Sequence, residues 1–175
     1  MKVRSPRSLV CVLFLVFAGR VAWAAEHVAV LELGADTESD LPPAGSRLGP
    51  SLAVEVTPID EWLELELGLA ALKSRHATHW ETDFLFKKPW TLSSTIEFMV
   101  GLGPTWTRVS QPTGVTSTAG AELALDFMFW RTQRWGWYLE PSYGVDFARG
   151  HGQSVGISFG ILFGVHGKGR AEMTQ

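Results

Sequence analysis

Acidic side chains recur at every second position in several segments of the chain, each time alternating with apolar side chains. In residues 62–69, for example, Glu64 and Glu66 alternate with leucines. Alternate side chains of a β-strand lie on one face, so both carboxylates would point the same way. Eleven acidic residues fall on the polar face of such segments: Glu32, Glu55, Glu64, Glu66, Glu81, Asp83, Glu97, Glu122, Asp126, Glu140 and Asp146. Carboxylates crowded on one face can share protons or bind cations, which is the first chemistry that the sequence indicates.

The candidate acidic cluster consists of Glu64, Glu66, Glu97, Glu122, Asp126 and Glu140. On the same face we find Lys87 and, at the edge of its segment, His79 as basic partners. Further basic side chains would have to fold in from loops: Lys73, Arg75, Arg108 and Arg149. We hypothesise a cation-binding or proton-relay site around Glu64, Glu66, Glu97, Asp126 and Glu140. The alternative is a solvated polar interior without a site, and no particular metal is indicated.

Candidate catalytic residues are few. The nearest approach to a nucleophile with its base is Ser154 with His151. Residues three apart in a strand point to opposite faces, whereas a base and its nucleophile must meet within about 3 Å. His76 and His79 form a His-x-x-His pair without further metal ligands. The sequence therefore predicts no catalytic residue beyond the weak candidates His151 and Ser154, and no cofactor.

The elements that would position these residues are β-strands. Leucine and glutamate are good helix formers, but a helix would scatter the glutamates of residues 62–69 around its circumference. The same alternation recurs along the chain, although it is poor in the first segment. We predict eight strands, over residues 28–34, 51–57, 62–69, 80–87, 91–103, 120–130, 137–147 and 154–166.

The connections between the predicted strands alternate in length. Short connections are predicted at residues 58–61, 88–90 and 131–134, and mostly longer ones at residues 35–50, 73–79, 108–117 and 149–153. Several strands reach about ten residues, the length of a tilted membrane-spanning strand. These features predict an all-β, eight-stranded antiparallel up-and-down transmembrane barrel. Both termini of the chain in the barrel would then lie on the short-turn rim, the periplasmic side.

Tryptophans mark the ends of the predicted strands. Those beside the short connections are Trp62, Trp90, Trp130, Trp135 and Trp137, and those toward the opposite rim are Trp80 and Trp106. Indole favours the interface between membrane and water, because it is apolar with one polar N–H group. We therefore predict two aromatic girdles facing lipid. Core tryptophans of a soluble fold would have no reason to gather at strand ends.

The first residues indicate a secretory signal peptide. Lys2, Arg4 and Arg7 precede an apolar run over residues 9–18, and Ala22-Trp23-Ala24 follows as a cleavage pattern. The expected organisation is a signal peptide at 1–24, a barrel domain at 25–166 and a tail at 167–175. Cys11 is the single cysteine, which excludes an internal disulfide framework and a zinc ribbon.

Composition limits the remaining function classes. The chain has 175 residues, a net charge of −3 and 46% hydrophobic residues. Nothing in this balance indicates the basic face that nucleic-acid binding requires. After the leader, no apolar run reaches 18 residues, so no membrane-spanning helix is predicted.

At this point the chain resembles the small eight-stranded outer-membrane barrels of Gram-negative bacteria, over residues 26–166. Residues 136–160, which begin Gly-Trp-Tyr-Leu-Glu-Pro, also resemble uncharacterised outer-membrane barrel proteins. The resemblance implies an outer-membrane location, with membrane lipid, lipopolysaccharide and the barrel assembly machinery as partners. Such barrels usually finish on an aromatic residue, whereas here twelve residues follow Phe163. Either the tail is an appended extension or assembly uses an internal signal.

Three functions compete. The leading one is an integral outer-membrane barrel with a structural or surface-interaction role and no wide pore, because eight strands enclose too little space. A secreted soluble barrel of the lipocalin type would turn the same alternation inside out and bind an apolar ligand. A lipid A-modifying hydrolase is the enzymatic alternative, opposed by the spacing of His151 and Ser154.

Overall fold

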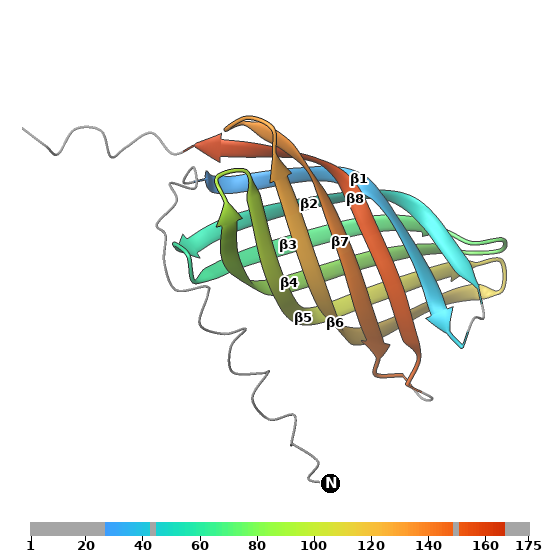
Figure 1. Cartoon of the computed structure of the whole chain (residues 1–175). Coiled ribbons are helices and arrows are strands. Elements are labelled where there is room, and N and C mark those ends of the chain that lie inside the picture. Colours follow the sequence, from blue (N-terminus) through green and yellow to red (C-terminus); the bar gives the residue numbers. More distant parts are fainter. Residues whose placement is uncertain (1–26, 43–44, 149–150, 167–175) are drawn as a thin grey trace, which may run out of the picture.

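The protein is a closed barrel of eight β-strands (Figure 1). We describe a computed structural model that covers residues 27–42, 45–148 and 151–166. The strands are β1 (His27–Leu41), β2 (Ser46–Ile59), β3 (Leu63–Lys73), β4 (Thr78–Ser93), β5 (Ile96–Gln111), β6 (Gly114–Trp130), β7 (Trp135–Asp146) and β8 (Gln153–His166). Each strand pairs antiparallel with the next, and β1 closes the sheet on β8. The predicted eight-stranded up-and-down barrel is confirmed.

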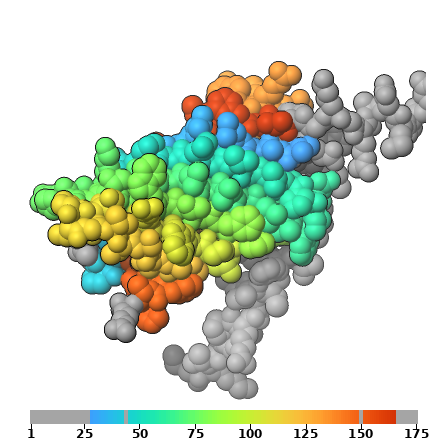
Figure 2. Space-filling model, turned by 180° about the vertical axis from the view of Figure 1, so that it is seen from behind, coloured from blue at the N-terminus to red at the C-terminus, as the bar shows by residue number. Residues whose placement is uncertain are grey.

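The alternation of the sequence becomes an outside and an inside. On β8, every second side chain from Val155 to Val165 is exposed, whereas Leu162 is fully buried. On β2, Val54 is 43% exposed while its neighbour Glu55 is 1% exposed. Apolar side chains therefore coat the outer wall. Figure 2 shows the molecule from the side where β2 to β6 lie. Within the described residues, no helix is long and apolar enough to cross a membrane.

The strands are longer, and one set of loops shorter, than the sequence predicted. The connections at the end opposite the start of β1 are residues 42–45, 74–77, 112–113 and 147–152. The predicted long loop at residues 35–50 is mostly strand, because β1 and β2 stay in register from Ala35 opposite Pro50 to Ser39 opposite Ser46. Residues 35–41 are largely polar on both faces, so the period-two signal fades while the ladder continues. The predicted contrast between long loops and short turns is therefore wrong.

The turn between β4 and β5 also differs from its prediction. The sequence placed it at residues 88–90, but β4 runs through Pro89 to Ser93 and the turn lies at Ser94–Thr95. The predicted strand over residues 91–103 therefore combines two strands. Pro89 pairs with Met99 on β5, whereas the pairing of β4 with β3 extends only as far as Lys87. Proline has no backbone N–H to donate. It is tolerated at this position because the pairing with β3 has already ended, so no donor is needed on that side.

Side chains fill the interior in layers. An apolar cluster lies toward the end that carries the start of β1 and the end of β8: Val30, Met99, Met128, Trp130, Tyr138 and Leu162. A charged layer around Lys87 comes next, and a cavity extends from it toward the opposite end. We call the first end the terminal end and the second the loop end (Figure 1). This layering places the predicted acidic cluster inside the barrel.

Candidate functional site: the charged interior

Lys87 lies at the centre of the charged layer. Its side chain is fully buried, and its Nζ donates hydrogen bonds to Asp126 Oδ2 at 2.9 Å and Glu140 Oε2 at 2.7 Å. The same Nζ lies 3.6 Å from Glu55 Oε2 and contacts the carboxylate of Glu66. The four carboxylates come from β2, β3, β6 and β7. One ammonium group therefore ties together strands on opposite sides of the barrel.

Strand register explains why these groups meet. Glu55 and Glu66 are cross-strand partners on β2 and β3, and Lys87 follows on β4 opposite Glu64. Because the barrel is narrow, Asp126 and Glu140 approach from the far wall. Transfer of charges from water into such a layer is costly, and the ion pairs offset that cost only when several partners surround the charge.

The structure brings together half of the predicted acidic cluster. Glu66, Asp126 and Glu140 meet at Lys87, as described above. Glu64 is half-buried and lies opposite Lys87 in the register of β3 and β4. The predicted basic partner Lys87 is thus the residue around which the interior is organised.

The other two members of the predicted cluster lie elsewhere. Glu97 accepts a hydrogen bond from Trp130 Nε1 at 3.1 Å, toward the terminal end. Glu122 is half-buried and lines the cavity on the loop side of Lys87. The six acidic residues therefore share the interior without forming a single site.

Within the part of the chain that the structure describes, one group of buried carboxylates is close enough to surround a cation: Glu32, Glu55, Glu66 and Asp126. One oxygen from each lies within 4.8 Å of the others. Hard cations take such oxygen ligands. Lys87 Nζ already contacts Glu55, Glu66 and Asp126, so an internal ammonium group occupies much of this space. The set overlaps the hypothesised cation site at Glu66 and Asp126.

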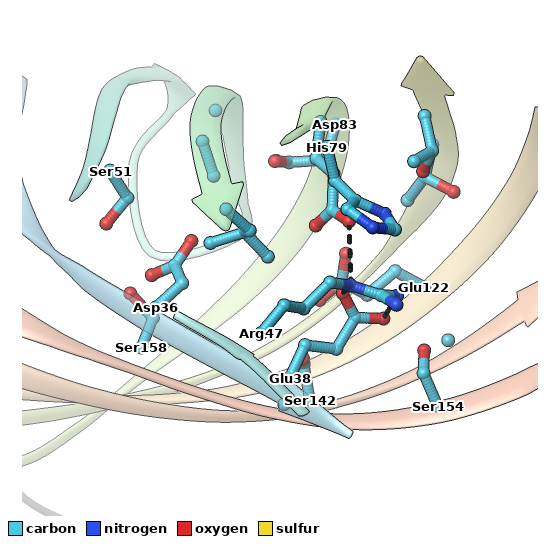
Figure 3. Close-up of a pocket in the computed structure, with 18 of the residues that line it drawn as sticks. Asp36, Glu38, Arg47, Ser51, His79, Asp83, Glu122, Ser142, Ser154 and Ser158 are labelled. Carbon is cyan, nitrogen blue, oxygen red and sulfur yellow. Dashed lines mark hydrogen bonds and ion pairs between the residues drawn. The ribbon is translucent and has the colours of Figure 1, made fainter. Parts of the chain in front are cut away.

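A polar cavity of about 510 Å³ extends from the charged layer toward the loop end. Arg47 of β2 lies across it, with its guanidinium 2.7 Å from Glu38 Oε1, 2.9 Å from Asp40 Oδ1 and 3.4 Å from Glu81 Oε1. Figure 3 shows Arg47 between Glu38 and His79. Arg47 is thus a second internal cation, close to the rim.

The predicted site residues do not include Asp36, Glu38 or Arg47, because the sequence predicts a loop over residues 35–50. The signal was present, since the alternate positions from Glu32 through Asp36 and Glu38 continue one face of β1. The basic residues expected to fold in from loops do not do so: Lys73, Arg75 and Arg108 are exposed, and Arg149 lies outside the described residues. His79 is half-buried and lines the cavity.

Six of the seven tryptophans that the structure describes point outward, with exposed fractions between 44% and 60%: Trp62, Trp80, Trp90, Trp106, Trp135 and Trp137. The assignment of Trp130 to a girdle is wrong, because its side chain is 8% exposed and lies inside the barrel. Odd-numbered residues of β6 such as Leu123 and Leu125 face outward, so an even-numbered residue near its end faces inward.

Aromatic side chains on the outer wall also contact one another across strands near the terminal end. Phe98 packs between Trp90 and Phe127, with ring centroids 5.8 and 4.9 Å away. Phe129 and Trp137 are stacked with centroids 3.9 Å apart. Each pair joins residues that are opposite in register, which is how cross-strand pairs stabilise a sheet. The result is a band of aromatic rings around part of this end.

The weak catalytic candidates lie in different surroundings. His151 is exposed in the turn after β7, with a φ of 46°. Ser154 lies near the start of β8, is half-buried and lines the cavity. The geometry therefore adds no support to a nucleophile–base pair formed by these two residues.

Comparison with solved structures shows the same fold in small outer-membrane barrels. The N-terminal β-barrel domain of Pseudomonas aeruginosa OprF is 13% identical, with a TM-score of 0.58 over 80% of this chain and 100% of that one. Neisserial surface protein A (NspA) is 10% identical, with a TM-score of 0.62 over 78% of this chain and 96% of that one. The attachment invasion locus protein Ail of Yersinia pestis is 10% identical, with a TM-score of 0.55 over 79% and 98%.

No family model and no curated protein matches the sequence. At identities of 10–13%, the likeness to the solved barrels concerns the fold. The architecture implied by the sequence resemblance is therefore present, while the role of the interior depends on this chain's own residues.

Proposed function

We propose that the protein is an integral outer-membrane β-barrel with a structural or surface-interaction role and no wide channel. The observation that carries this proposal is the orientation of the wall. Apolar side chains such as Leu67 and Phe159 are about half exposed, at 50% and 53%, while Glu55 and Lys87 are each 1% exposed. A closed sheet with an apolar exterior suits lipid, because it leaves no unpaired strand edge in the hydrocarbon.

The same orientation opposes the soluble lipocalin-like alternative. A lipocalin-like barrel would place its apolar faces inside and its acidic faces in water. Here the buried polar and charged side chains are Glu32, Glu55, Glu66, Lys87, Asp126 and Glu140. An apolar coat over a whole outer wall would be a severe aggregation hazard for a protein in water.

The absence of a wide channel follows from the filling of the interior. Met99, Met128 and Leu162 are at most 1% exposed, and they lie beside the Lys87 layer. Together these layers occupy the barrel on the terminal side of the cavity. General permeation of solutes is therefore not part of the proposed function.

A surface role is supported by exposed basic and aromatic groups toward the loop end. Arg75 lies in the β3–β4 loop and its side chain is exposed. Arg108 lies on the same strand and face as Trp106, and these two side chains are also exposed. Guanidinium groups pair with phosphates, so we propose lipopolysaccharide phosphates as their partners. At the other end, Phe163 of β8 is 42% exposed, and we propose it as the aromatic residue that the barrel assembly machinery reads.

The test of the membrane location is fractionation of cells that express the full chain. We expect the protein to sediment with outer membranes after carbonate extraction and to show a heat-modifiable shift on electrophoresis. Recovery in the soluble periplasmic fraction would contradict the proposal. Planar-bilayer recordings should show no porin-like conductance steps.

A second test measures the orientation of the tryptophans directly. In vesicles of brominated lipid, Trp135→Phe should reduce the quenchable part of the fluorescence, because Trp135 is 45% exposed on the outer wall. Trp130→Phe should leave the quenchable part almost unchanged, because Trp130 lies inside. The opposite result would mean that the barrel does not sit in lipid as proposed.

A further inference from the structure

The cavity has a section in which acidic side chains lack a basic partner. Arg47 pairs with Glu38, Asp40 and Glu81 at the loop end, and Lys87 pairs with its four carboxylates at the other end. Between these two cations lie three acidic residues of the cavity wall: Asp36, Asp83 and Glu122. Among the described residues that line the cavity, the basic ones are Arg47 and His79. The middle section therefore holds more acidic than basic side chains.

A buried carboxylate at the inner end of the cavity has an open acceptor. Glu32 is 2% exposed, it lines the cavity, and its Oε1 has no hydrogen-bond partner. A buried acceptor without a partner costs free energy, so it needs an explanation. Asp83 shows the same feature at Oδ1. These atoms are positioned to receive donors that the described part of the protein does not supply.

Gly68 shows that the fold makes room for the Asp83 carboxylate. The two residues are opposite in register on β3 and β4. A Cβ atom at position 68 would lie 2.6 Å or less from both carboxylate oxygens of Asp83. A glycine at this position therefore lets the carboxylate lie flat against the neighbouring strand, with space beside it in the cavity.

We propose that this cavity binds a linear aliphatic polyamine. Its ammonium groups would donate to the carboxylates of Glu32, Asp83 and Glu122. Its methylene groups would lie against the apolar side chains that also line the cavity: Leu72, Leu85 and Tyr138. A volume of about 510 Å³ falls within the usual range of small-molecule sites.

The spacing of the acids favours an extended organic cation over a metal ion. Asp83 and Glu122 lie on β4 and β6, and neither belongs to the convergent group of carboxylates formed by Glu32, Glu55, Glu66 and Asp126. An extended cation can reach separate carboxylates, whereas a metal ion needs converging ligands. Among the described residues, the convergent group is the one around Lys87, where an ammonium group is already present.

The test is calorimetric titration of spermidine into the full chain, refolded in neutral detergent. Asp83→Asn combined with Glu122→Gln should weaken spermidine binding about tenfold or more, because two charge-assisted hydrogen bonds are lost. Asp60→Asn, in the exposed β2–β3 turn, is the matched control and should change the affinity less than twofold. Arg47→Gln should strengthen binding, because it frees three carboxylates and removes a competing cation.

Three results would overturn the proposal. The first is no spermidine binding by the unaltered protein, and the second is a loss of affinity in Asp60→Asn as large as that in the double variant. The third is displacement of spermidine by Mg²⁺ at a concentration that supplies the same amount of positive charge. If the double variant loses its heat-modifiable shift, it has not folded. Glu32→Gln then takes its place and should also weaken spermidine binding. Nuclear magnetic resonance on the unaltered protein gives an independent reading. Spermidine should shift the amide signals of Asp36, Asp83 and Ser158, which line the cavity (Figure 3), and shifts confined to the exterior would contradict the site.

Discussion

Two basic residues inside the barrel solve the same problem in different surroundings. Lys87 is entirely buried and its partners Glu55 and Asp126 are at most 2% exposed at their side chains. Arg47 is 13% exposed, and one of its partners, Asp40, is 41% exposed. Both residues pair with carboxylates from more than one strand. The two residues differ in whether water can solvate their partner carboxylates when the basic side chain is removed.

That difference determines what each residue contributes. Near the loop end, water can solvate Glu38 and Asp40 if Arg47 is removed, so the ion pairs act mainly to order the rim. In the charged layer, the carboxylates have no such substitute. The interior therefore depends on Lys87 for folding, while the neighbourhood of Arg47 remains available for binding.

The largest expected effect comes from Lys87→Met. The substitution preserves much of the side-chain volume but leaves four carboxylates without their shared cation. We expect a loss of about 3–5 kcal/mol in the free energy of unfolding, because the partners of a broken buried ion pair stay buried. Equilibrium urea unfolding in lipid vesicles, followed by tryptophan fluorescence, measures this loss.

Lys73→Met is the matched control, because Lys73 is exposed at the end of β3. It should change the free energy of unfolding by less than about 0.5 kcal/mol. Addition of Asp126→Asn to Lys87→Met should recover part of the lost stability, because one unpaired carboxylate is removed. A small effect of Lys87→Met alone would show that the charged layer is more hydrated than its burial indicates.

A smaller effect is expected for Trp130→Phe. The indole donates to Glu97 Oε2 at 3.1 Å and packs in the apolar cluster beside Met128. Loss of a hydrogen bond to a carboxylate should reduce the free energy of unfolding by about 2 kcal/mol. The same urea experiment applies, with the signal taken from the remaining tryptophans.

Trp135→Phe separates the inner tryptophan from the outer ones. Trp135 is 45% exposed on the outer wall, so its replacement removes less packing and should cost less than half as much as Trp130→Phe. Equal losses for the two variants would contradict the assignment of Trp130 to the interior.

Much of this arrangement was predictable from alternation alone. The parity of the sequence placed Lys87 and eleven acidic residues on one face, and the structure puts that face inside. The contacts themselves were not predictable, because the meeting of Lys87 with Asp126 depends on the register of several strands and on closure of the barrel. Hydrophobic periodicity fixes which face a residue occupies, but it does not fix the height of one strand against another.

The errors of the prediction concentrate where the apolar signal fades. Glu38 and Arg47 lie in strand segments where apolar residues do not alternate regularly with polar ones, so the sequence predicts a loop there. The sequence predicts a turn at Pro89, whereas β4 continues through it, and proline is tolerated there because the adjacent strand β3 has already ended. Trp130 was grouped with the other tryptophans by position along the chain, although its parity pointed inward.

Arg47→Met should have a much smaller effect than Lys87→Met, and it completes the comparison of the two basic residues. We expect a loss of about 1 kcal/mol in the free energy of unfolding, because the freed carboxylates near the rim can be solvated. Raising the salt concentration should shrink this loss, since exposed ion pairs are screened, and it should leave the effect of Lys87→Met nearly unchanged. Urea unfolding at low and high salt measures both dependences. A loss for Arg47→Met as large as that for Lys87→Met, and equally insensitive to salt, would mean that the loop end is as dry as the charged layer and that the cavity is closed to ligands.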